Sequence, residues 1–244
     1  MTTVSDALRN GEREAATLTE CLAVDTLHLL KRTFADLALT PEQIAALSAK
    51  SITARMASAG ATLYAHRGLD AMPTLLAHPS DTVRSWAPYV LACAPELSLE
   101  DRIARVRVSA DDPHFGVREW AWMALRPHLA QDLTRAIATL TPWTRDPSPN
   151  IRRFVTEATR PRGVWCKKID ALVREPQLAL PLLDPLCSDP ERYVQNSVAN
   201  WLNDASKSQP AWVQSLCKRW RSENKSKSTE YICKRALRTL TPRA

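Results

Sequence analysis

The chain has 244 residues and a mass of 27.3 kDa, with 45% hydrophobic and 24% charged residues, a composition typical of a globular protein that buries its own core. Only 5 Gly accompany 17 Pro, which argues against glycine-rich phosphate-binding loops and a many-hairpin β architecture, while abundant Ala and Leu favour helices. The sequence shows no signal-peptide core and no apolar stretch of membrane-spanning length, so we expect a cytoplasmic protein with no membrane partner.

Charge is divided unevenly along the chain. The formal net charge is +7, but residues 1–122 carry 12 Lys and Arg against 15 Asp and Glu, whereas residues 123–244 carry 21 against 11. A basic half of this kind favours nucleic acid or another polyanion as a partner, although solvated helix faces also collect Lys and Arg.

Cysteine and histidine spacing gives no sign of a metal centre. The six cysteines contain no Cys-x-x-Cys pair, and the five histidines contain no His-x-x-x-His pair. We therefore expect reduced thiols packed between helices and no structural metal. These residues are Cys21, Cys93, Cys166, Cys187, Cys217, Cys233, His28, His66, His78, His114 and His128.

Residues 1–77 are predicted to form N-terminal helices. Within residues 12–58 and just beyond them, breaks are predicted at Thr40–Pro41 and at Gly60, because proline does not continue a helix and glycine is a weak helix former.

From residue 78 onward the sequence repeats. Aliphatic anchor residues recur at spacings of 34, 34, 43 and 38 residues, and apolar residues follow each anchor by 3, 4, 7 and 8 positions, as on the buried face of a helix. Residues 99–108, 131–140 and 212–220 are predicted to be partner helices. The anchors are Val83, Val117, Ile151, Val194 and Ile232.

The repeated helices have a common predicted start. A proline stands four residues before each of the first four anchors, and three of these prolines follow Asp112, Asp146 or Asp189. Asp at the N-cap followed by Pro at the first helical position is a favourable helix start. Pro127 and Pro161 mark positions where two of the helices are predicted to end or bend.

Two helices per unit of 34 to 43 residues are typical of HEAT-like repeats. We predict an all-α fold, a HEAT-like repeat α-solenoid (α-α superhelix) in a single domain over residues 1–244, and a monomer. The 43-residue unit has extra residues around Pro176 and Pro181, so its first helix is predicted to be broken. Arg235 occupies a normally apolar position of the last unit, as expected for an end cap.

A second face of the repeated helices collects charge. Three consecutive units place a carboxylate on it, from Glu119, Glu157 and Asp204. This pattern predicts a basic groove with acids at its centre, suited to a phosphodiester ligand. The alternative is that the acids are intramolecular salt-bridge partners of the arginines. The surrounding cations are Arg126, Arg153, Arg160, Lys234 and Arg238, with Arg152 and Arg162 close by.

Trp165 is predicted to lie on the loop after the helix that carries Glu157, because it follows Pro161 and Gly163. There an aromatic ring can face a ligand, although packing alone is the other interpretation. Other tryptophans occupy apolar helix positions and are predicted to be core: Trp86, Trp120 and Trp201. No Gly-x-Ser-x-Gly motif or readable Cys–His pair supports nucleophilic hydrolysis, and no lysine supports lyase chemistry.

Three segments resemble the AlkC/AlkD superfamily of DNA alkylation repair proteins, and are closer to AlkC. They are Gly-Val-Arg-Glu-Trp-Ala-Trp (116–122), Arg-Arg-Phe-Val-Thr-Glu-Ala-Thr-Arg-Pro-Arg (152–162) and Tyr-Val-Gln-Asn-Ser-Val-Ala-Asn-Trp-Leu-Asn-Asp (193–204). The similarity covers about residues 78–220. This chain departs from AlkC-like sequences at Trp201, where they usually have His, and at Gln195, where they have a basic residue.

The resemblance implies a HEAT-like-repeat DNA glycosylase that excises cationic N-alkylated bases such as 3-methyladenine without metal or cofactor. It also implies that Glu119, Glu157, Trp165 and Asp204 form the lesion site. We therefore predict a monofunctional alkylbase DNA glycosylase acting on double-stranded DNA and associated with the nucleoid. The predicted phosphate contacts are Arg126, Arg152, Arg153, Arg160, Arg162, Lys207, Lys234 and Arg238.

Two other functions remain open at this point. A non-catalytic binder of branched or damaged DNA would use the same groove without releasing a base. A protein-binding scaffold would have little affinity for DNA at about 0.15 M salt.

Overall fold

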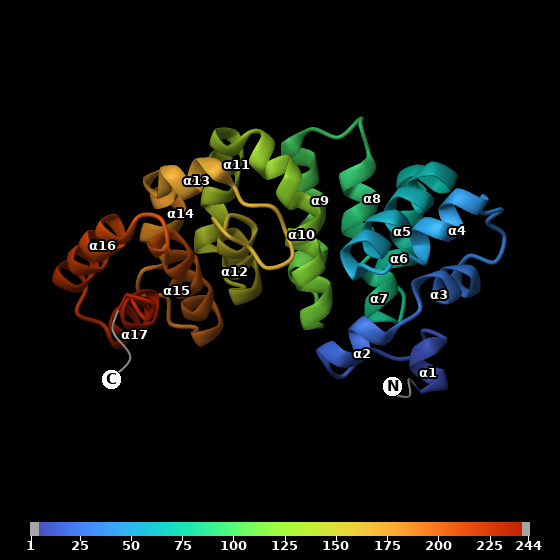
Figure 1. The fold of residues 1–244 in the computed structure, drawn as a ribbon, viewed down its shortest axis with the longest axis horizontal. Coiled ribbons are helices and arrows are strands. Elements are labelled where there is room, and N and C mark those ends of the chain that lie inside the picture. Colours follow the sequence, from blue (N-terminus) through green and yellow to red (C-terminus); the bar gives the residue numbers. More distant parts are fainter. Residues whose placement is uncertain (1–4, 241–244) are drawn as a thin grey trace. The chain divides into compact units, whose positions relative to one another are not determined.

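The computed structural model describes residues 5–240, and within this range the chain is all-α, with no strand. The predicted fold class is confirmed, because helices pair as HEAT-like repeats (Figure 1). The chain forms two compact units, Met1–Leu125 and Arg126–Ala244, whose boundary falls inside helix α10 (Phe115–Gln131). Each unit is described by itself, and the single-domain organisation stays a prediction. None of the described helices combines the length and hydrophobicity needed to cross a bilayer.

In the first unit, helix α5 packs against α8 and α4, and the core is filled by side chains such as Leu63, Trp86 and Val90. The helices of this unit before α10 are α1 (Asp6–Arg9), α2 (Leu18–Ala23), α3 (Thr26–Thr33), α4 (Pro41–Leu47), α5 (Ile52–Arg67), the 3-10 helix η1 (Gly68–Ala71), α6 (Met72–Leu76), α7 (Asp81–Arg84), α8 (Ala87–Cys93) and α9 (Leu99–Ala110).

In the second unit, α15 lies against α12, α16 and α17. Its core includes Val198, Trp201 and Trp220. The elements that follow α10 are α11 (Leu133–Leu140), η2 (Thr141–Arg145), α12 (Pro149–Ala158), α13 (Asp170–Arg174), η3 (Pro176–Ala179), α14 (Leu180–Leu183), η4 (Asp184–Leu186), α15 (Arg192–Ser206), α16 (Pro210–Glu223) and α17 (Lys227–Ala236).

The hydrophobic pattern of the repeats is confirmed by burial. All five anchors are fully buried, and so are the core tryptophans Trp86 and Trp201, while Trp120 is nearly so. The three partner helices form as α9, α11 and α16. The first helix of the 43-residue unit is broken into α13, η3, α14 and η4, as the extra prolines predict. Arg235 is exposed, in line with an end cap.

Gly60 does not break a helix, contrary to the sequence prediction. It lies inside α5, at the point where that helix meets α8. A Cβ on Gly60 would lie 2.7 Å from the carbonyl carbon of Tyr89 and closer still to its Cβ. The residue is small because the two backbones touch here. Thr40–Pro41 behaves as predicted: Thr40 caps α4 and Pro41 is its first residue.

The predicted Asp–Pro helix start is also wrong, by two residues. The N-cap of α12 is Ser148, two positions after Asp146, and the N-cap of α15 is Glu191, two positions after Asp189. Each aspartate instead accepts a hydrogen bond from the backbone N–H two residues later, 2.9 Å from Ser148 N to Asp146 Oδ1 and 2.9 Å from Glu191 N to Asp189 Oδ1. These Asx turns lead the chain into the helix.

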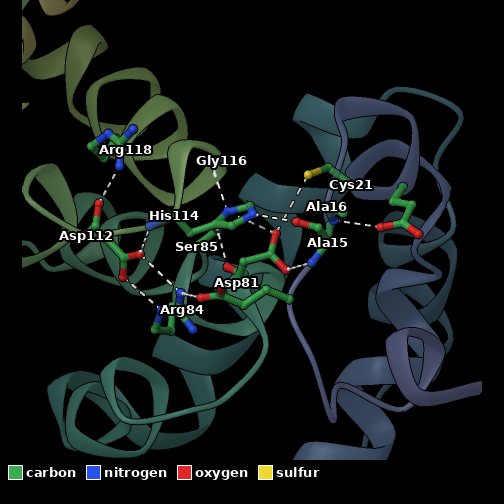
Figure 2. Close-up of polar contacts among 12 residues, drawn as sticks. Ala15, Ala16, Cys21, Asp81, Arg84, Ser85, Asp112, His114, Gly116 and Arg118 are labelled. Atoms are coloured by element: carbon green, nitrogen blue, oxygen red, sulfur yellow. Dashed lines mark hydrogen bonds and ion pairs between the residues drawn. The ribbon is translucent and has the colours of Figure 1, made fainter.

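The aspartates also join neighbouring repeats. Arg84 donates two hydrogen bonds to Asp112, 2.8 Å from Nε to Oδ2 and 3.1 Å from Nη2 to Oδ1 (Figure 2). Arg152 binds Asp189 in the same way, at 2.6 and 3.1 Å. Each arginine follows its anchor directly, and its Nη1 donates to two backbone carbonyls of its own repeat. For Arg152 these are Asp146 O and Pro147 O. This Arg–Asp ladder fixes one repeat against the next.

The last junction of the ladder has a neutral version of the same contacts. Gln195 stands in the position of Arg152, and its Nε2 donates to Asp189 O at 2.7 Å and to Pro190 O at 3.2 Å. Its partner in the following repeat is the hydroxyl of Ser228, 3.0 Å away, in place of an aspartate. The departure of Gln195 from the resembled family is therefore matched by its partner.

Candidate functional site in the second unit

The structure joins two of the predicted acids through one arginine. Arg160 Nη1 lies 3.1 Å from Glu157 Oε2, and its Nε and Nη2 lie 2.8 and 2.7 Å from Asp204 Oδ2. Arg153 Nη2 lies 3.0 Å from Glu157 Oε1, and Lys207 Nζ lies 3.0 Å from Asp204 Oδ1. We call these five residues the charged cluster. With three cations and two anions it carries a net charge of +1, and it spans the end of α12 and the end of α15.

The acids of the charged cluster are buried, while its outer cation is not. The side chains of Glu157 and Asp204 are 3% and 5% exposed, whereas Lys207 is 47% exposed. Burial works against the charge of Arg160, but Glu157 and Asp204 outweigh it and raise the pKa of the guanidinium. The salt-bridge alternative left open by the sequence is therefore what the structure contains. Both acids are paired with cations on the same charged face.

One carboxylate oxygen of this cluster is held by charge alone. Arg153 Nη2 approaches Glu157 Oε1 to 3.0 Å, but without the alignment of a hydrogen bond, so this buried oxygen accepts none within the described residues. Arg153 also places its guanidinium over the Tyr193 ring, 4.2 Å from the centroid, and donates to Tyr193 O at 3.2 Å. The ring and the acid together fix the arginine beside the cluster.

Trp165 lies on the loop that follows α12 and is 54% exposed, as is its neighbour Val164 at 56%. It is the one described residue other than glycine with a positive φ, 58°. A bulky side chain in this backbone region is uncommon, so its outward orientation is set by the loop rather than by local preference.

The 161–168 loop is closed at its base by hydrogen bonds. Ile169 N donates to Pro161 O at 3.1 Å. Arg126 donates to Ala158 O at 3.0 Å, to Arg160 O at 2.5 Å and to Lys167 O at 3.1 and 3.2 Å, so one guanidinium holds both ends of the loop. Since Arg160 is itself part of the charged cluster, the loop that carries Trp165 starts at the cluster.

Arg126 and Arg152 are placed where a phosphate contact does not fit. Arg126 is 3% exposed, its nitrogens donate to carbonyls, and burial lowers the pKa of its guanidinium. Arg152 is committed to Asp189 and to two carbonyls of the ladder. Both were predicted to bind DNA from a periodicity that gives a helix face but not the partners on it, and the structure gives both a structural role.

The other predicted cations lie at the surface of the second unit or close to it. Lys207, Lys234 and Arg238 are exposed, and Arg238 donates to Asn200 Oδ1 at 3.0 Å. Arg162 is half-buried and donates to Ser208 Oγ at 2.5 Å, which ties the 161–168 loop to the end of α15.

Glu119 belongs to the first unit, in α10. Its Oε2 accepts a hydrogen bond of 2.8 Å from the indole Nε1 of Trp122, one helical turn further on. Its joint placement with Glu157 and Asp204 in one groove stays a prediction.

Comparison with known proteins identifies the family of this chain. Residues 117–240 match the family described as DNA alkylation repair enzyme, which is half of the chain and contains the whole charged cluster. The chain belongs to this family. Over 117 residues it is 39% identical to YhaZ of Bacillus subtilis, a match that covers 48% of this chain and 32% of that protein.

Two solved structures resemble the chain. The alkylpurine DNA glycosylase AlkC of Pseudomonas fluorescens, bound to DNA containing an abasic site analog, is 28% identical with a TM-score of 0.69, covering 93% of this chain and 65% of that one. AlkD2 of Streptococcus mutans is 20% identical with a TM-score of 0.58, covering 86% of this chain and 95% of that one, and shares the fold. The chain thus spans about a third of YhaZ and about two thirds of the solved AlkC chain.

Two groups of contacts were not predicted from the sequence. An arginine follows three of the anchors directly in the sequence, which is the visible part of the Arg–Asp ladder. The aspartate that each ladder arginine binds lies in the next repeat, so the pairing cannot be read from one repeat alone. A second group, Cys21, Asp81 and His114, comes from three distant segments of the first unit, so no spacing rule finds it.

Proposed function

We propose that this protein is a monofunctional DNA glycosylase that hydrolyses the N-glycosidic bond of cationic N-alkylated bases, such as 3-methyladenine, in double-stranded DNA. The observation that carries the proposal is the charged cluster at the base of an exposed tryptophan loop, within the region that matches the DNA alkylation repair family. The glycosylase activity in the name of AlkC supports the same reaction.

The proposed substrate is a good leaving group without acid catalysis. An N3-alkylated purine carries a positive charge, so the electron pair of the glycosidic bond neutralises the base as it leaves. The sugar develops positive charge at the same time, which a carboxylate stabilises. Water then adds to the sugar carbon, and its proton passes to a carboxylate acting as general base.

The residues divide these tasks by position. Asp204 is our first choice for stabilising the sugar cation and orienting the water, with Glu157 beside it and Glu119 assisting. Arg160 keeps both Glu157 and Asp204 paired and oriented. The exposed face of Trp165 attracts a cationic base by about 1–2 kcal/mol where water is excluded, and a neutral base gains much less.

Access to Asp204 runs through Lys207. Among the described residues, the hydrogen-bonding partner of Asp204 Oδ1 is the ammonium of this exposed lysine, whereas Oδ2 is held by Arg160. A DNA phosphate that attracts Lys207 uncovers Oδ1 while Oδ2 stays fixed. Lys234, Arg238 and Arg162 extend the proposed phosphate contacts, with Arg153 and Arg160 behind them.

The test is release of 3-methyladenine from methylated duplex DNA. Asp204→Asn and Glu157→Gln each keep the size of the side chain and remove the charge, and we expect release to fall about 100-fold or more for Asp204→Asn. Glu230→Gln is the matched control. Glu230 is also an ion-paired acid of the second unit, but its partner is Arg221, and neither residue belongs to the charged cluster. Unchanged release by both cluster variants would refute the site.

A non-catalytic binder of damaged or branched DNA is the second candidate. The observation in its favour is that both acids are buried and paired with cations, which suits a structural role. It predicts salt-sensitive DNA binding by wild type with no base release, and affinity that does not depend on the charge of Asp204.

A further inference from the structure

Asp81 is a buried carboxylate with few donors. It is the first residue of α7, and its side chain is 3% exposed. Its Oδ1 accepts a hydrogen bond of 2.9 Å from Ala15 N. Its Oδ2 contacts Cys21 and His114 (Figure 2), at 3.8 Å from Cys21 Sγ and 3.5 Å from His114 Nδ1. A carboxylate this deep normally has a cation or several hydrogen-bond donors beside it.

The ring of His114 is fixed in one tautomer. Gly116 N donates to Nδ1 at 3.1 Å, so Nδ1 carries a lone pair, and the protonated Nε2 donates to Ala15 O at 2.7 Å. The lone pair of Nδ1 and the Oδ2 of Asp81 are therefore two acceptors only 3.5 Å apart. They are kept near each other without a proton to share.

Gly116 leaves space beside His114 Nδ1 and Asp81 Oδ2, because it has no side chain. A Cβ on Gly116 would lie 3.1 Å from His114 Nδ1 and 3.6 Å from Asp81 Oδ2. No side chain therefore projects from this position toward the pair.

We propose that Cys21, Asp81 and His114 form a binding site for a zinc ion, with Sγ, Oδ2 and Nδ1 as the three ligand atoms. These atoms all lie within 4.8 Å of one another. Zinc bonds of about 2.3 Å to sulfur and about 2.0–2.2 Å to nitrogen and oxygen place tetrahedral ligand atoms about 3.3–3.7 Å apart. Two of the three separations, 3.5 and 3.8 Å, already have nearly this length.

The surroundings of the three residues match those of metal ligands. A metal-bound histidine almost always donates its other ring N–H to a carbonyl or carboxylate, as His114 Nε2 does to Ala15 O. Ala15 also orients Asp81, because its backbone N–H donates a hydrogen bond to Asp81 Oδ1. A thiolate, a carboxylate and a neutral imidazole form a mixed sulfur, oxygen and nitrogen set that suits zinc better than magnesium or calcium.

Metal binding at these three side chains would replace weak contacts with metal bonds. The Cys21 thiol donates a weak hydrogen bond to Asp81 Oδ2, with 3.8 Å between Sγ and Oδ2. Zinc binding would release the thiol proton to solvent, replace the weak Sγ–Oδ2 hydrogen bond with two metal bonds, and take the Nδ1 lone pair from Gly116 N–H.

The ligands come from three separate parts of the first unit. Cys21 lies on α2, Asp81 begins α7, and His114 immediately precedes α10. A bound ion would fasten the N-terminal segment to the starts of two repeat helices. Because the ligands are 60 and 33 residues apart in the chain, the spacing argument that predicted no structural metal could not detect them.

The experiment titrates chelator-treated full-length protein with Co²⁺ as a spectroscopic substitute for zinc. We expect a thiolate-to-cobalt charge-transfer band and the visible bands of a tetrahedral site, both displaced by one equivalent of Zn²⁺. Cys21→Ser and His114→Gln remove the bands. The matched control Cys93→Ser, a half-buried cysteine of the same unit outside the site, keeps them.

A second measurement does not depend on the variants. Zn²⁺ should protect Cys21 of the wild-type protein from alkylation, measured cysteine by cysteine with mass spectrometry, and leave the rate at Cys93 unchanged. The melting temperature should rise with free zinc in wild type and in Cys93→Ser but not in Cys21→Ser. Cobalt bands that persist in Cys21→Ser, or protection of other cysteines instead of Cys21, would mean adventitious binding only. Absence of any band would mean that the three residues do not bind the metal. Each of these outcomes would overturn the proposal.

Discussion

Replacing Arg152 with Met tests whether this arginine holds repeats together or binds DNA. In the structure its Nε and Nη2 bind Asp189, whose side chain is 3% exposed, and its Nη1 binds two carbonyls. Methionine keeps most of the aliphatic stem and removes the four hydrogen bonds. Asp189 then stays buried without its arginine, and of the donors described above for its side chain the backbone N–H of Glu191 remains.

The magnitude follows from that burial. Removing one partner of a buried ion pair costs about 3–5 kcal/mol, because the other charge is left without compensation. An exposed pair would cost less than about 1 kcal/mol. For a protein of this size, each kcal/mol corresponds to about 2–4 °C in melting temperature, so we expect a decrease of roughly 6–20 °C.

Denaturant unfolding of Arg152→Met and of the double variant Arg152→Met/Asp189→Asn is the assay. The double variant removes the orphaned charge and should recover part of the lost stability, while the affinity of the folded protein for DNA and its salt dependence should stay at the wild-type level. A loss below about 1 kcal/mol, or a weaker salt dependence of DNA binding, would refute the assignment of Arg152 to the ladder.

Three further predictions concern other contacts. Restoring the charged junction with Gln195→Arg and Ser228→Asp together should be less harmful than either change alone, and a double-mutant cycle of unfolding free energies measures the coupling. Gly60→Ala should destabilise the first unit by about 1–3 kcal/mol in chemical denaturation, because its Cβ meets the backbone of Tyr89, and a neutral result would contradict that close approach. Burial and then the charge of Arg84 lower the pKa of His78 from its ordinary 6.5, so the stability contributed by its neutral ring, whose Nδ1 accepts from Ser80 N, is present above pH 6.5 and is lost as the pH falls below it. The melting temperature should therefore drop more between about pH 7.5 and about pH 5.5 in wild type than in His78→Asn, whose neutral amide can accept the same bond.

The fold was predictable because burial repeats with a period. Val83, Val117 and the other anchors follow from hydrophobic spacing, which records one face of a helix and needs no knowledge of partners. The exact helix starts were not predictable in the same way. Asp146 and Asp189 are of a residue type that is common at N-caps. Asp189, however, pairs with an arginine of the preceding repeat, which places its side chain in the junction between repeats. Each aspartate forms an Asx turn instead of a cap, and the helix begins two residues later.

The charged cluster was predictable in part for the same reason. Periodicity placed Glu157, Asp204 and several arginines on one face, and the structure pairs these acids through Arg160. It could not say which cations face solvent. Arg126 and Lys207 share a charge sign, yet one is 3% exposed and holds carbonyls while the other lies at the surface. That distinction depends on neighbours supplied by the 161–168 loop, which has no period.

The grip of Arg126 on both ends of the 161–168 loop has a consequence for ligand binding. A surface aromatic on a slack segment must give up backbone freedom when it contacts a ligand, at about 1–2 kcal/mol for each residue that becomes ordered. Here the guanidinium already ties both ends of the loop, so in the function proposed above Trp165 would meet a ligand preorganised, and more of the contact energy would appear as affinity. On that proposal, affinity at the indole would depend on Arg126, a residue that is only 3% exposed.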